Sequence, residues 1–119
     1  MRIDDDMSQI YPQLLTADAV VLATPLYYFN MTAQLKRALD RFFAVNPALH
    51  ESPKKICLIS AGNDRDDWAM DTLKANVHAL CRYLNWQEGG MVLALGVNTR
   101  EDVEKSGYKA MARELGAGI

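Results

Sequence analysis

The sequence predicts an α/β domain in which helices cover both faces of a three-stranded parallel sheet. Three short apolar runs alternate with longer segments of helical periodicity along the 119 residues. The apolar runs lack the polar alternation of strands with one solvated face, which is typical of strands buried on both faces. The resulting order, α-β-α-β-α-β-α, favours right-handed crossovers and a single domain over residues 1–119.

The first segment predicts a helix that leads into a first strand, Ala19–Ala23. The acidic residues 4–6 place negative charge at the start of this helix, where the helix dipole favours it. Pro12 would remove a hydrogen bond from the helix interior, so we expect the helix to begin nearer Tyr11. The apolar residues at helical spacing are Met7, Ile10 and Leu14.

A second helix is predicted from about Thr32, and a second strand over Lys55–Ser60. Asn46-Pro47 and Ser52-Pro53 favour turns and bracket a polar connection between the two. We expect Lys55–Ser60 to be the central strand of the sheet. The apolar face of the helix consists of Leu35, Ala38, Leu39 and Phe42.

The third predicted strand, Met91–Leu95, follows a long helix and the pair Gly89-Gly90. A last helix is predicted after Thr99, whose spacing from Asp102 resembles a capping box, and Gly116 closes it. The inward residues are Ala69, Leu73, Val77, Leu80 and Leu84 in the long helix, and Val103, Met111 and Leu115 in the last one.

The overall composition is that of an ordinary globular protein, with 50% hydrophobic residues, 24% charged residues and a formal net charge of −2. This balance gives no electrostatic reason to expect nucleic acid or an anionic membrane as a partner. No apolar stretch reaches membrane-spanning length, and the acidic start is the opposite of a secretory signal. Cys57 and Cys81 lack metal-site or disulfide spacing, so we interpret them as reduced core thiols of a cytoplasmic protein.

Two loops form the predicted ligand site, because open parallel sheets bind ligands just beyond the carboxyl ends of their strands. The aromatic residues of the first loop offer flat ring faces to a conjugated ligand, and its backbone amides could hydrogen-bond a heterocycle. The glycine of the second loop lets the backbone approach a ligand closely. The candidate binding residues are Thr24, Pro25, Leu26, Tyr27, Tyr28, Phe29 and Asn30 in the first loop, and Ala61, Gly62, Asn63 and Asp64 in the second.

Both loops also have a plain structural interpretation, and the sequence leaves it open. From composition alone, it is about as probable that the aromatic side chains cover the edge of the sheet or an oligomer contact as that they bind a ligand. Gly62-Asn63-Asp64, taken alone, could be a simple turn.

Other kinds of chemistry find less support in the sequence. No Gly-x-Gly-x-x-Gly or Walker-type loop provides a phosphate cradle, and no Ser, Cys or Lys nucleophile stands beside a recognisable base. The run Asp64–Asp67 fits the acids of a helix N-terminus better than a metal site. His50 and His78 have no partners at catalytic spacing, and Lys36 with Asp40 fits an exposed ion pair.

A series of short motifs runs along nearly the whole chain. The motifs are Asp5-Asp6-Met7, Ala17-Asp18-Ala19-Val20-Val21, Thr24-Pro25-Leu26-Tyr27-Tyr28, Ala33-Gln34-Leu35-Lys36 with Asp40-Arg41, Tyr83-Leu84-Asn85-Trp86, Leu95-Gly96-Val97 and Ala112-Arg113-Glu114-Leu115-Gly116. In this order they resemble the flavodoxin-like NAD(P)H-dependent FMN reductase family, which includes the iron–sulfur flavoproteins. Each motif is weak alone, and the combination is specific.

The resemblance implies a flavodoxin-like three-layer α/β/α sandwich and gives both loops a role. In the family, the loop matching Thr24–Asn30 lies against the isoalloxazine ring of FMN, and the loop matching Ala61–Asp64 contacts it from the next strand. FMN carries a hydride from NAD(P)H to an acceptor, so the implied function is that of a flavoprotein oxidoreductase. The resemblance assigns no catalytic side chain and no metal ligand to this chain.

The chain departs from the family at its start. Family members begin with a strand, a Ser/Thr-rich phosphate-binding loop, a helix and a second strand, and iron–sulfur members carry a cysteine cluster ahead of the Asp-Asp-Met segment. The resemblance thus implies an N-terminally incomplete domain with strands 3, 4 and 5 of the order 2-1-3-4-5. We expect FMN to bind weakly or not at all, and the alternative function is a cofactor-free structural or oligomerisation module.

Loss of the first family strand would expose the backbone edge of Ala19–Ala23, where no proline or lysine discourages pairing. Each unmet buried polar group costs about 1–3 kcal/mol. We therefore expect a homo-oligomer, most simply a two-fold dimer, that uses this edge, the aromatic loop Leu26–Phe29, or both.

Overall fold

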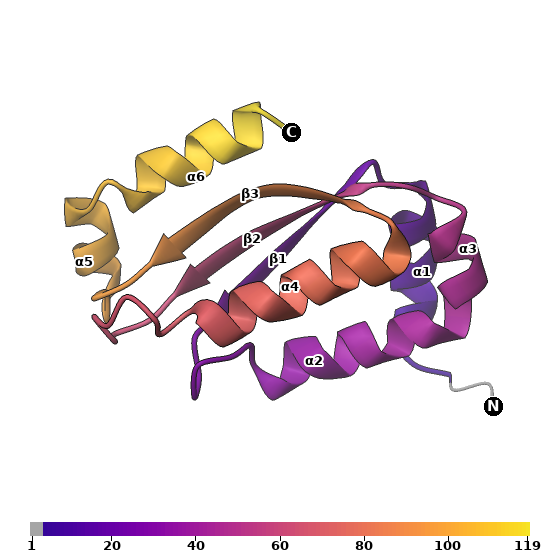
Figure 1. The fold of residues 1–119 in the computed structure, drawn as a ribbon, viewed down its shortest axis with the longest axis horizontal. Helices are drawn as coiled ribbons and strands as arrows, with labels where there is room; N and C mark the ends of the chain where they lie inside the picture. Colours follow the sequence, from indigo (N-terminus) through magenta and orange to yellow (C-terminus); the bar gives the residue numbers. More distant parts are fainter. Residues whose placement is uncertain (1–3) are drawn as a thin grey trace.

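Figure 1 shows the computed structural model, which describes residues 4–119. Three parallel strands form one sheet in the order β1-β2-β3, with β1 at Ala19–Pro25, β2 at Lys55–Ala61 and β3 at Gln87–Ala94. The predicted sheet, with Lys55–Ser60 in its central strand, is confirmed. The helices are α1 (Met7–Thr16), α2 (Ala33–Asp40), α3 (Asn46–His50), α4 (Asp71–Leu84), α5 (Arg100–Lys105) and α6 (Tyr108–Ala117), with a 3₁₀ helix, η1, at Arg41–Val45.

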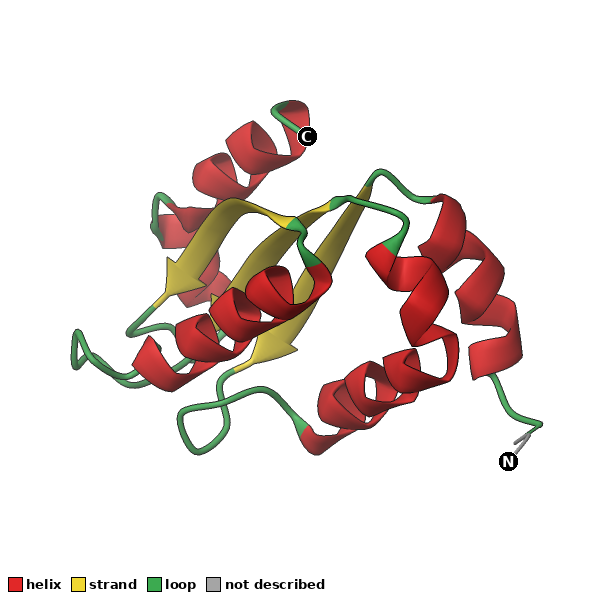
Figure 2. Cartoon of the chain, turned by 45° about the vertical axis from the view of Figure 1, so that its right-hand side comes forward, coloured by secondary structure: helices red, strands yellow, loops and turns green. Residues whose placement is uncertain are grey.

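The helices lie on two sides of the sheet and beyond one end of it. Helices α2 and α4 lie on one side, α5 and α6 lie on the other, and α1 and α3 stand near the amino ends of the strands (Figures 1 and 2). Within residues 4–119, no helix has both the length and the apolar character that a membrane span requires.

The core face of the sheet is the face that bears Leu22 and Leu58, which are neighbours in the β1–β2 register. Both side chains are buried in one hydrophobic cluster with Leu73 and Val77 of α4. Leu49 is also fully buried in this cluster, although the sequence predicted a polar connection there. Pro47 lies in the first turn of α3, where a missing N–H costs little, and the short helix turns Leu49 inward.

The outer face of the sheet, which bears the odd-numbered residues of β1, is covered unevenly. Helix α6 packs over β3, where a Cβ atom added to Gly90 would lie 2.4 Å from Leu115 Cδ1. Over β1, Val21 is 45% exposed and Ala23 is also exposed. The expectation that all three strands are covered on both faces is therefore wrong for β1, because no described helix reaches its outer face.

Strand β3 begins earlier than predicted, at Gln87, and contains both glycines. Its register against β2 shifts there, since Glu88 lies opposite Ile56 whereas Met91 lies opposite Leu58. A bulge of this kind bends a strand and increases its twist.

The boundaries of α1 also differ from the prediction. The helix begins at Met7 and contains Pro12, so the expected start near Tyr11 is wrong. Pro12 cannot donate to Ser8, which is exposed, so water can satisfy the Ser8 carbonyl. Met7 and Leu14 are buried as expected, whereas Ile10 is 44% exposed.

The last predicted helix is two helices in the structure, α5 and α6, separated by Ser106-Gly107. The predicted capping box is confirmed, because Thr99 accepts from the Asp102 amide and Asp102 accepts from the Thr99 amide. Met111 is 46% exposed, so its expected inward position is wrong. Leu115 is half-buried against β3, and α6 extends one residue beyond Gly116.

Lys54 joins several elements at the amino ends of the strands. Its buried Nζ donates to Ala17 O and to Ser52 Oγ, both at 2.9 Å, and lies 5.4 Å from the centre of the Trp86 ring. Burial lowers the pKa of Lys54. The two cysteines are free and buried, as the sequence indicated, and burial raises the pKa of the Cys81 thiol.

Candidate functional site

The carboxyl ends of the three strands meet in what we name the strand-end rim, formed by residues 24–30, 61–65 and 96–100. Backbone hydrogen bonds continue the sheet into these loops. Leu26 N donates to Ala61 O at 2.8 Å, Gly62 N to Ala94 O at 2.9 Å, and Val97 N to Gly62 O at 3.0 Å. The two loops predicted from the sequence are therefore brought side by side, together with a third.

The aromatic loop contains a tight turn with an unusual choice of residues. Tyr27 and Asn30 exchange two backbone hydrogen bonds of 3.0 and 3.2 Å, and the residues between them, Tyr28 and Phe29, have φ of 47° and 65°. Two central residues at positive φ define a type I′ turn, which strongly favours Asn-Gly. Aromatic residues in this conformation strain the backbone, at a cost of order 1–3 kcal/mol each.

The three rings of this loop have different surroundings. Tyr28 is 98% exposed and Tyr27 is 64% exposed. Phe29 contacts the ring of Trp68 with a centroid distance of 5.0 Å. Phe29 is therefore held against a neighbour, whereas the two tyrosine rings face solvent.

Two hollows at the rim share Leu26 and Gly62 in their linings. A Cβ atom on Gly62 would lie 3.0 Å from Leu26 Cβ, so this glycine allows the two loops to pack, a role that the sequence did not assign to it. One hollow, of about 280 Å³, is lined by Leu26, Tyr28, Phe29, Gly62, Asn63 and Asp64. The other, of about 400 Å³, is lined by Pro25, Leu26, Tyr27, Ala61, Gly62, Asn63, Val97, Asn98, Thr99, Arg100 and Val103.

Thr24 and Asn30 line neither hollow and instead fix the shape of the aromatic loop. Thr24 is buried, donates to Pro25 O at 2.8 Å and accepts from Thr32 N at 3.1 Å. Asn30 Oδ1 accepts from Met31 N at 2.8 Å and from Asn76 Nδ2 at 2.9 Å. The side-chain oxygens of both residues are thus engaged within the protein.

Sequence reasoning missed the third loop, Val97–Arg100, as part of the rim. Asp102 holds this loop by accepting from Asn98 N at 2.9 Å and from Thr99 N at 2.8 Å, and these bonds lower the pKa of Asp102. The available signal was Gly96 directly after the third apolar run. In the structure Gly96 has φ of 68° and packs against Arg65, where a side chain would be strained.

The acidic run Asp64–Asp67 does not start a helix, because α4 begins at Asp71. The expectation that these residues are helix N-terminal acids is therefore wrong. Asp64 instead accepts from Asp66 N at 2.9 Å and, through its backbone carbonyl, from Gly96 N at 2.8 Å. Over the described part of the chain, no group of three or more His, Cys, Asp or Glu side chains could hold a metal ion.

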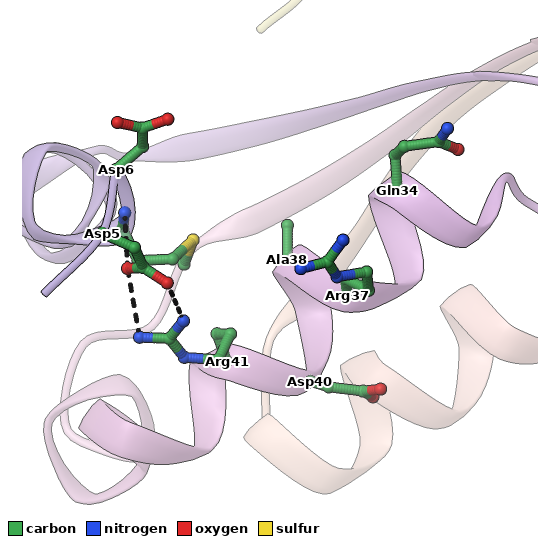
Figure 3. Close-up of a pocket in the computed structure, with 8 residues that line it drawn as sticks. Asp5, Asp6, Gln34, Arg37, Ala38, Asp40 and Arg41 are labelled. Carbon is green, nitrogen blue, oxygen red and sulfur yellow. Dashed lines mark hydrogen bonds and ion pairs between the residues drawn. The ribbon is translucent and has the colours of Figure 1, made fainter. Parts of the chain in front are cut away.

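A hollow of about 590 Å³, larger than either rim hollow, lies away from the rim, between the start of α1 and α2 (Figure 3). Arg41 forms an ion pair with Asp5 there, and this hydrogen bond is the main reason why the pKa of Asp5 is lowered. Asp6, Arg37 and Asp40 also line the hollow. Charges of both signs are mixed here, and the lining has no aromatic ring, so this hollow is less suited to a flat conjugated ligand than the rim.

Neither histidine lies at the rim. His50 contacts the ring of Tyr83 edge-on at 4.8 Å, and His78 pairs with Glu88 on the surface. Lys36 and Asp40 form the expected exposed ion pair.

Comparisons with known proteins identify relatives that share part of this sequence. Over 67 residues the chain is 39% identical to an iron-sulfur flavoprotein of Methanocaldococcus jannaschii, a match that covers 52% of this chain and 32% of the relative. It is 32% identical over 74 residues to an iron-sulfur flavoprotein of Methanosarcina thermophila, a match that covers 61% of this chain and 39% of the relative. The aligned part of the chain thus spans less than half the length of these curated relatives.

Solved structures share the fold. The Trp repressor binding protein from Bacillus subtilis superposes with a TM-score of 0.79 at 20% identity, over 92% of this chain and 75% of that one. The general stress protein 14 from Treponema denticola, solved in complex with FMN, superposes with a TM-score of 0.68 at 21% identity, over 96% of this chain and 71% of that one. A family model described as the flavodoxin-like fold, Flavodoxin_2, matches residues 1–117. The predicted α/β fold class is thus confirmed, and the chain belongs to the Flavodoxin_2 family of flavodoxin-like proteins.

Proposed function

We propose that the strand-end rim binds the isoalloxazine ring of FMN and that the protein takes part in hydride transfer from NAD(P)H. The observation that carries this proposal is the strained turn, where Tyr28 and Phe29 occupy positive-φ positions that glycine would fill at less cost. Tyr28 gains no packing in return, because its side chain is 98% exposed. Such strain is typical of residues whose side chains serve binding.

The residues of the rim fit a flat ring. Tyr28, Phe29 and Leu26 offer apolar surface in the smaller hollow, and Asn63 and Asp64 add polar atoms to it. The backbone N–H groups of Tyr28 and Asn63 donate to no acceptor among the described residues, so they are available to the carbonyl and nitrogen acceptors of a heterocycle.

The fit to a phosphate group is weaker. In residues 4–119 the cations on the rim loops are Arg65, which packs against Gly96, and Arg100, which is paired with Glu104 on the surface. The rim loops contain no glycine-rich segment that could surround a phosphate with amides. We therefore expect the ring to contribute most of the affinity.

FMN, when bound, supplies the chemistry by accepting a hydride from NAD(P)H and passing it on. The part of this chain is to orient the ring. Phe29 is fixed by Trp68, the loops are held by hydrogen bonds between neighbouring strand ends, and Tyr28 is free to close over one face of the ring. No side chain of the rim needs to donate or accept a proton in this proposal.

Titration of the chain with FMN and with riboflavin, followed by flavin fluorescence, tests the proposal. We expect weak, saturable binding of both, with affinities that differ by only a few fold because the phosphate has no cradle. The Tyr28→Gly variant should bind FMN about twofold to tenfold more weakly, the range expected for losing one aromatic contact. The same variant should gain about 1 kcal/mol in unfolding free energy, because glycine relieves the strain.

The matched control is Tyr83→Ala, which removes a 58% exposed tyrosine on α4, away from the rim. It should leave FMN affinity unchanged. Absence of saturable flavin binding by the unmodified chain would overturn the proposal. Equal affinity of the Tyr28→Gly variant and the unmodified chain would show that the strained turn does not serve the ring.

A second candidate function is a cofactor-free structural or oligomerisation module. Within residues 4–119, the uncovered outer face of β1 favours it, because it leaves apolar side chains such as Val21 available to another chain.

A further inference from the structure

The two rim hollows differ in the sign of their charge. The smaller hollow has a single charged side chain in its lining, the carboxylate of Asp64, since aspartate is ionised at neutral pH. The larger hollow also has a single charged side chain in its lining, and this is a cation, Arg100. The hollow to which we assign the ring is therefore the negatively charged one.

Asp64 is held in place and has no ion-paired partner. One of its carboxylate oxygens accepts from Asp66 N at 2.9 Å, and its backbone carbonyl accepts from Gly96 N at 2.8 Å. The adjacent cation, Arg65, packs against Gly96 and lines neither hollow. No ion pair within residues 4–119 includes Asp64. Its negative charge is thus left at the smaller hollow.

A carboxylate in this position acts differently on the two oxidation states of an isoalloxazine ring. The oxidised ring is neutral. Transfer of a hydride from NAD(P)H to N5 adds one hydrogen and two electrons, so the ring gains a negative charge near N1 while NAD(P)H becomes NAD(P)⁺. Like charges repel, whereas a neutral ring experiences little of this force. Only an interaction that differs between two states shifts their equilibrium, and the charge of Asp64 is such an interaction.

The uncharged polar groups of the hollow discriminate less between the two states. The free N–H groups of Tyr28 and Asn63 can donate to ring oxygens, which accept hydrogen bonds whether the ring is oxidised or reduced. These bonds are stronger to the charged ring and so oppose Asp64. A full charge acts over a longer distance than the dipole of an N–H group, so we expect the effect of Asp64 to prevail.

We propose that Asp64 makes the strand-end rim bind the oxidised ring more tightly than the reduced ring. This inference rests on the proposed binding of the ring at the rim. Because affinity and reduction potential are thermodynamically linked, weaker binding of the reduced ring lowers the potential of the bound flavin below that of free flavin. The bound ring is then a stronger reductant than free reduced FMN, which suits an electron acceptor of low potential.

Anaerobic equilibrium dialysis of the unmodified chain, once with oxidised FMN and once with FMN kept reduced, tests the inference. We expect reduced FMN to bind about threefold to thirtyfold more weakly, the range for two like charges several ångströms apart at a partly solvated site. Riboflavin should give a similar ratio of the two dissociation constants. The phosphate of FMN is charged in both oxidation states and therefore cancels in the ratio.

Two substitutions should shift this ratio in opposite directions. Asp64→Asn removes the charge and keeps the size and the oxygen that accepts from Asp66 N. It should bring the ratio close to one, through tighter binding of reduced FMN, and change the affinity for oxidised FMN less than about twofold. Asn63→Asp adds a second carboxylate to the same hollow and should weaken the binding of reduced FMN by about a further threefold or more. A damaged loop would not produce opposite shifts.

Asp67→Asn is the matched control, because Asp67 is an exposed carboxylate of the same loop that lines neither hollow. It should change the ratio less than about twofold, since solvent and salt screen its charge. Circular dichroism verifies that each variant still folds.

The outcomes separate this inference from the proposed function. Absence of saturable binding of oxidised FMN to the unmodified chain would overturn the proposed function and this inference with it. Binding of oxidised FMN with a ratio that Asp64→Asn leaves unchanged would overturn this inference alone. Tighter binding of reduced FMN by the Asn63→Asp variant would also overturn it.

Discussion

The two outer strands of the described sheet, β1 and β3, differ in how their faces are covered. Strand β3 carries two adjacent glycines and a bulge, and it is covered by α4 on the core face and by α6 on the outer face. Strand β1 is regular and fully apolar up to Thr24, yet its outer face is open. An apolar sequence therefore shows that a strand can be buried on both faces. Which faces are actually buried depends on the helices packed against it.

The largest expected effect compares two adjacent residues of β1 that point to opposite faces. Leu22→Ala should lower the unfolding free energy by about 2–5 kcal/mol, because Leu22 is buried in the core cluster. Val21→Ala should cost less than about 1 kcal/mol, because its side chain is half in solvent. Urea denaturation at low protein concentration, where self-association does not contribute, measures both. Equal losses would mean that the outer face of β1 is covered in the monomer.

A second comparison uses the two glycines of β3. A Cβ atom on Gly89 would lie 2.4 Å from Cys57 Sγ and 2.9 Å from Ile56 O, whereas one on Gly90 would meet only the end of the Leu115 side chain. Leu115 can rotate and the Ile56 backbone cannot, so Gly89→Ala should cost about 1–3 kcal/mol and Gly90→Ala clearly less. Thermal unfolding of both variants shows which substitution lowers the stability more. A larger cost for Gly90→Ala would show that α6 is fixed more rigidly than β2.

The smallest expected effect lies outside the sheet and depends on pH. Arg41 lowers the pKa of Asp5, so the stabilisation from this pair is present above the ordinary carboxyl pKa of about 3.9 and is lost as pH falls through the lowered value. Asp5→Asn should therefore reduce the fall in melting temperature below about pH 4. The effect is small because the pair is exposed to solvent.

Asp6→Asn is the control for this pH dependence, because Asp6 forms no described ion pair and no cap hydrogen bond. An Asp5→Asn variant that loses stability at neutral pH while keeping the full acid slope would contradict the assignment.

The sequence predicted the sheet well because each strand is a short apolar run between clear turn signals. Order, direction and the central position of Lys55–Ser60 all follow from alternation with helices, and all are confirmed. The helix boundaries were less predictable. Pro12 sits inside α1 because the carbonyl it leaves unpaired is exposed, and the break at Ser106-Gly107 depends on how α6 packs over β3. Both are properties of the folded environment rather than of local sequence.

The candidate site was predictable in position but not in detail. The rule that strand ends meet at one edge placed Tyr27–Phe29 beside Gly62–Asp64, and the structure brings them together. Thr24 and Asn30 shape the aromatic loop instead of lining a hollow, because they form hydrogen bonds with Thr32 and Asn76. No rule based on residue spacing predicts these hydrogen bonds. The binding role of these residues is a prediction that flavin titration tests.

The bulge of β3 has a consequence for how far association can proceed. A sheet with two regular free edges could add copies head to tail without limit, as in a fibril. Here the register shift at Gly89-Gly90 bends and twists β3, which makes its outer edge a poor template for an incoming strand. The bulge should therefore keep further copies from extending the sheet beyond β3.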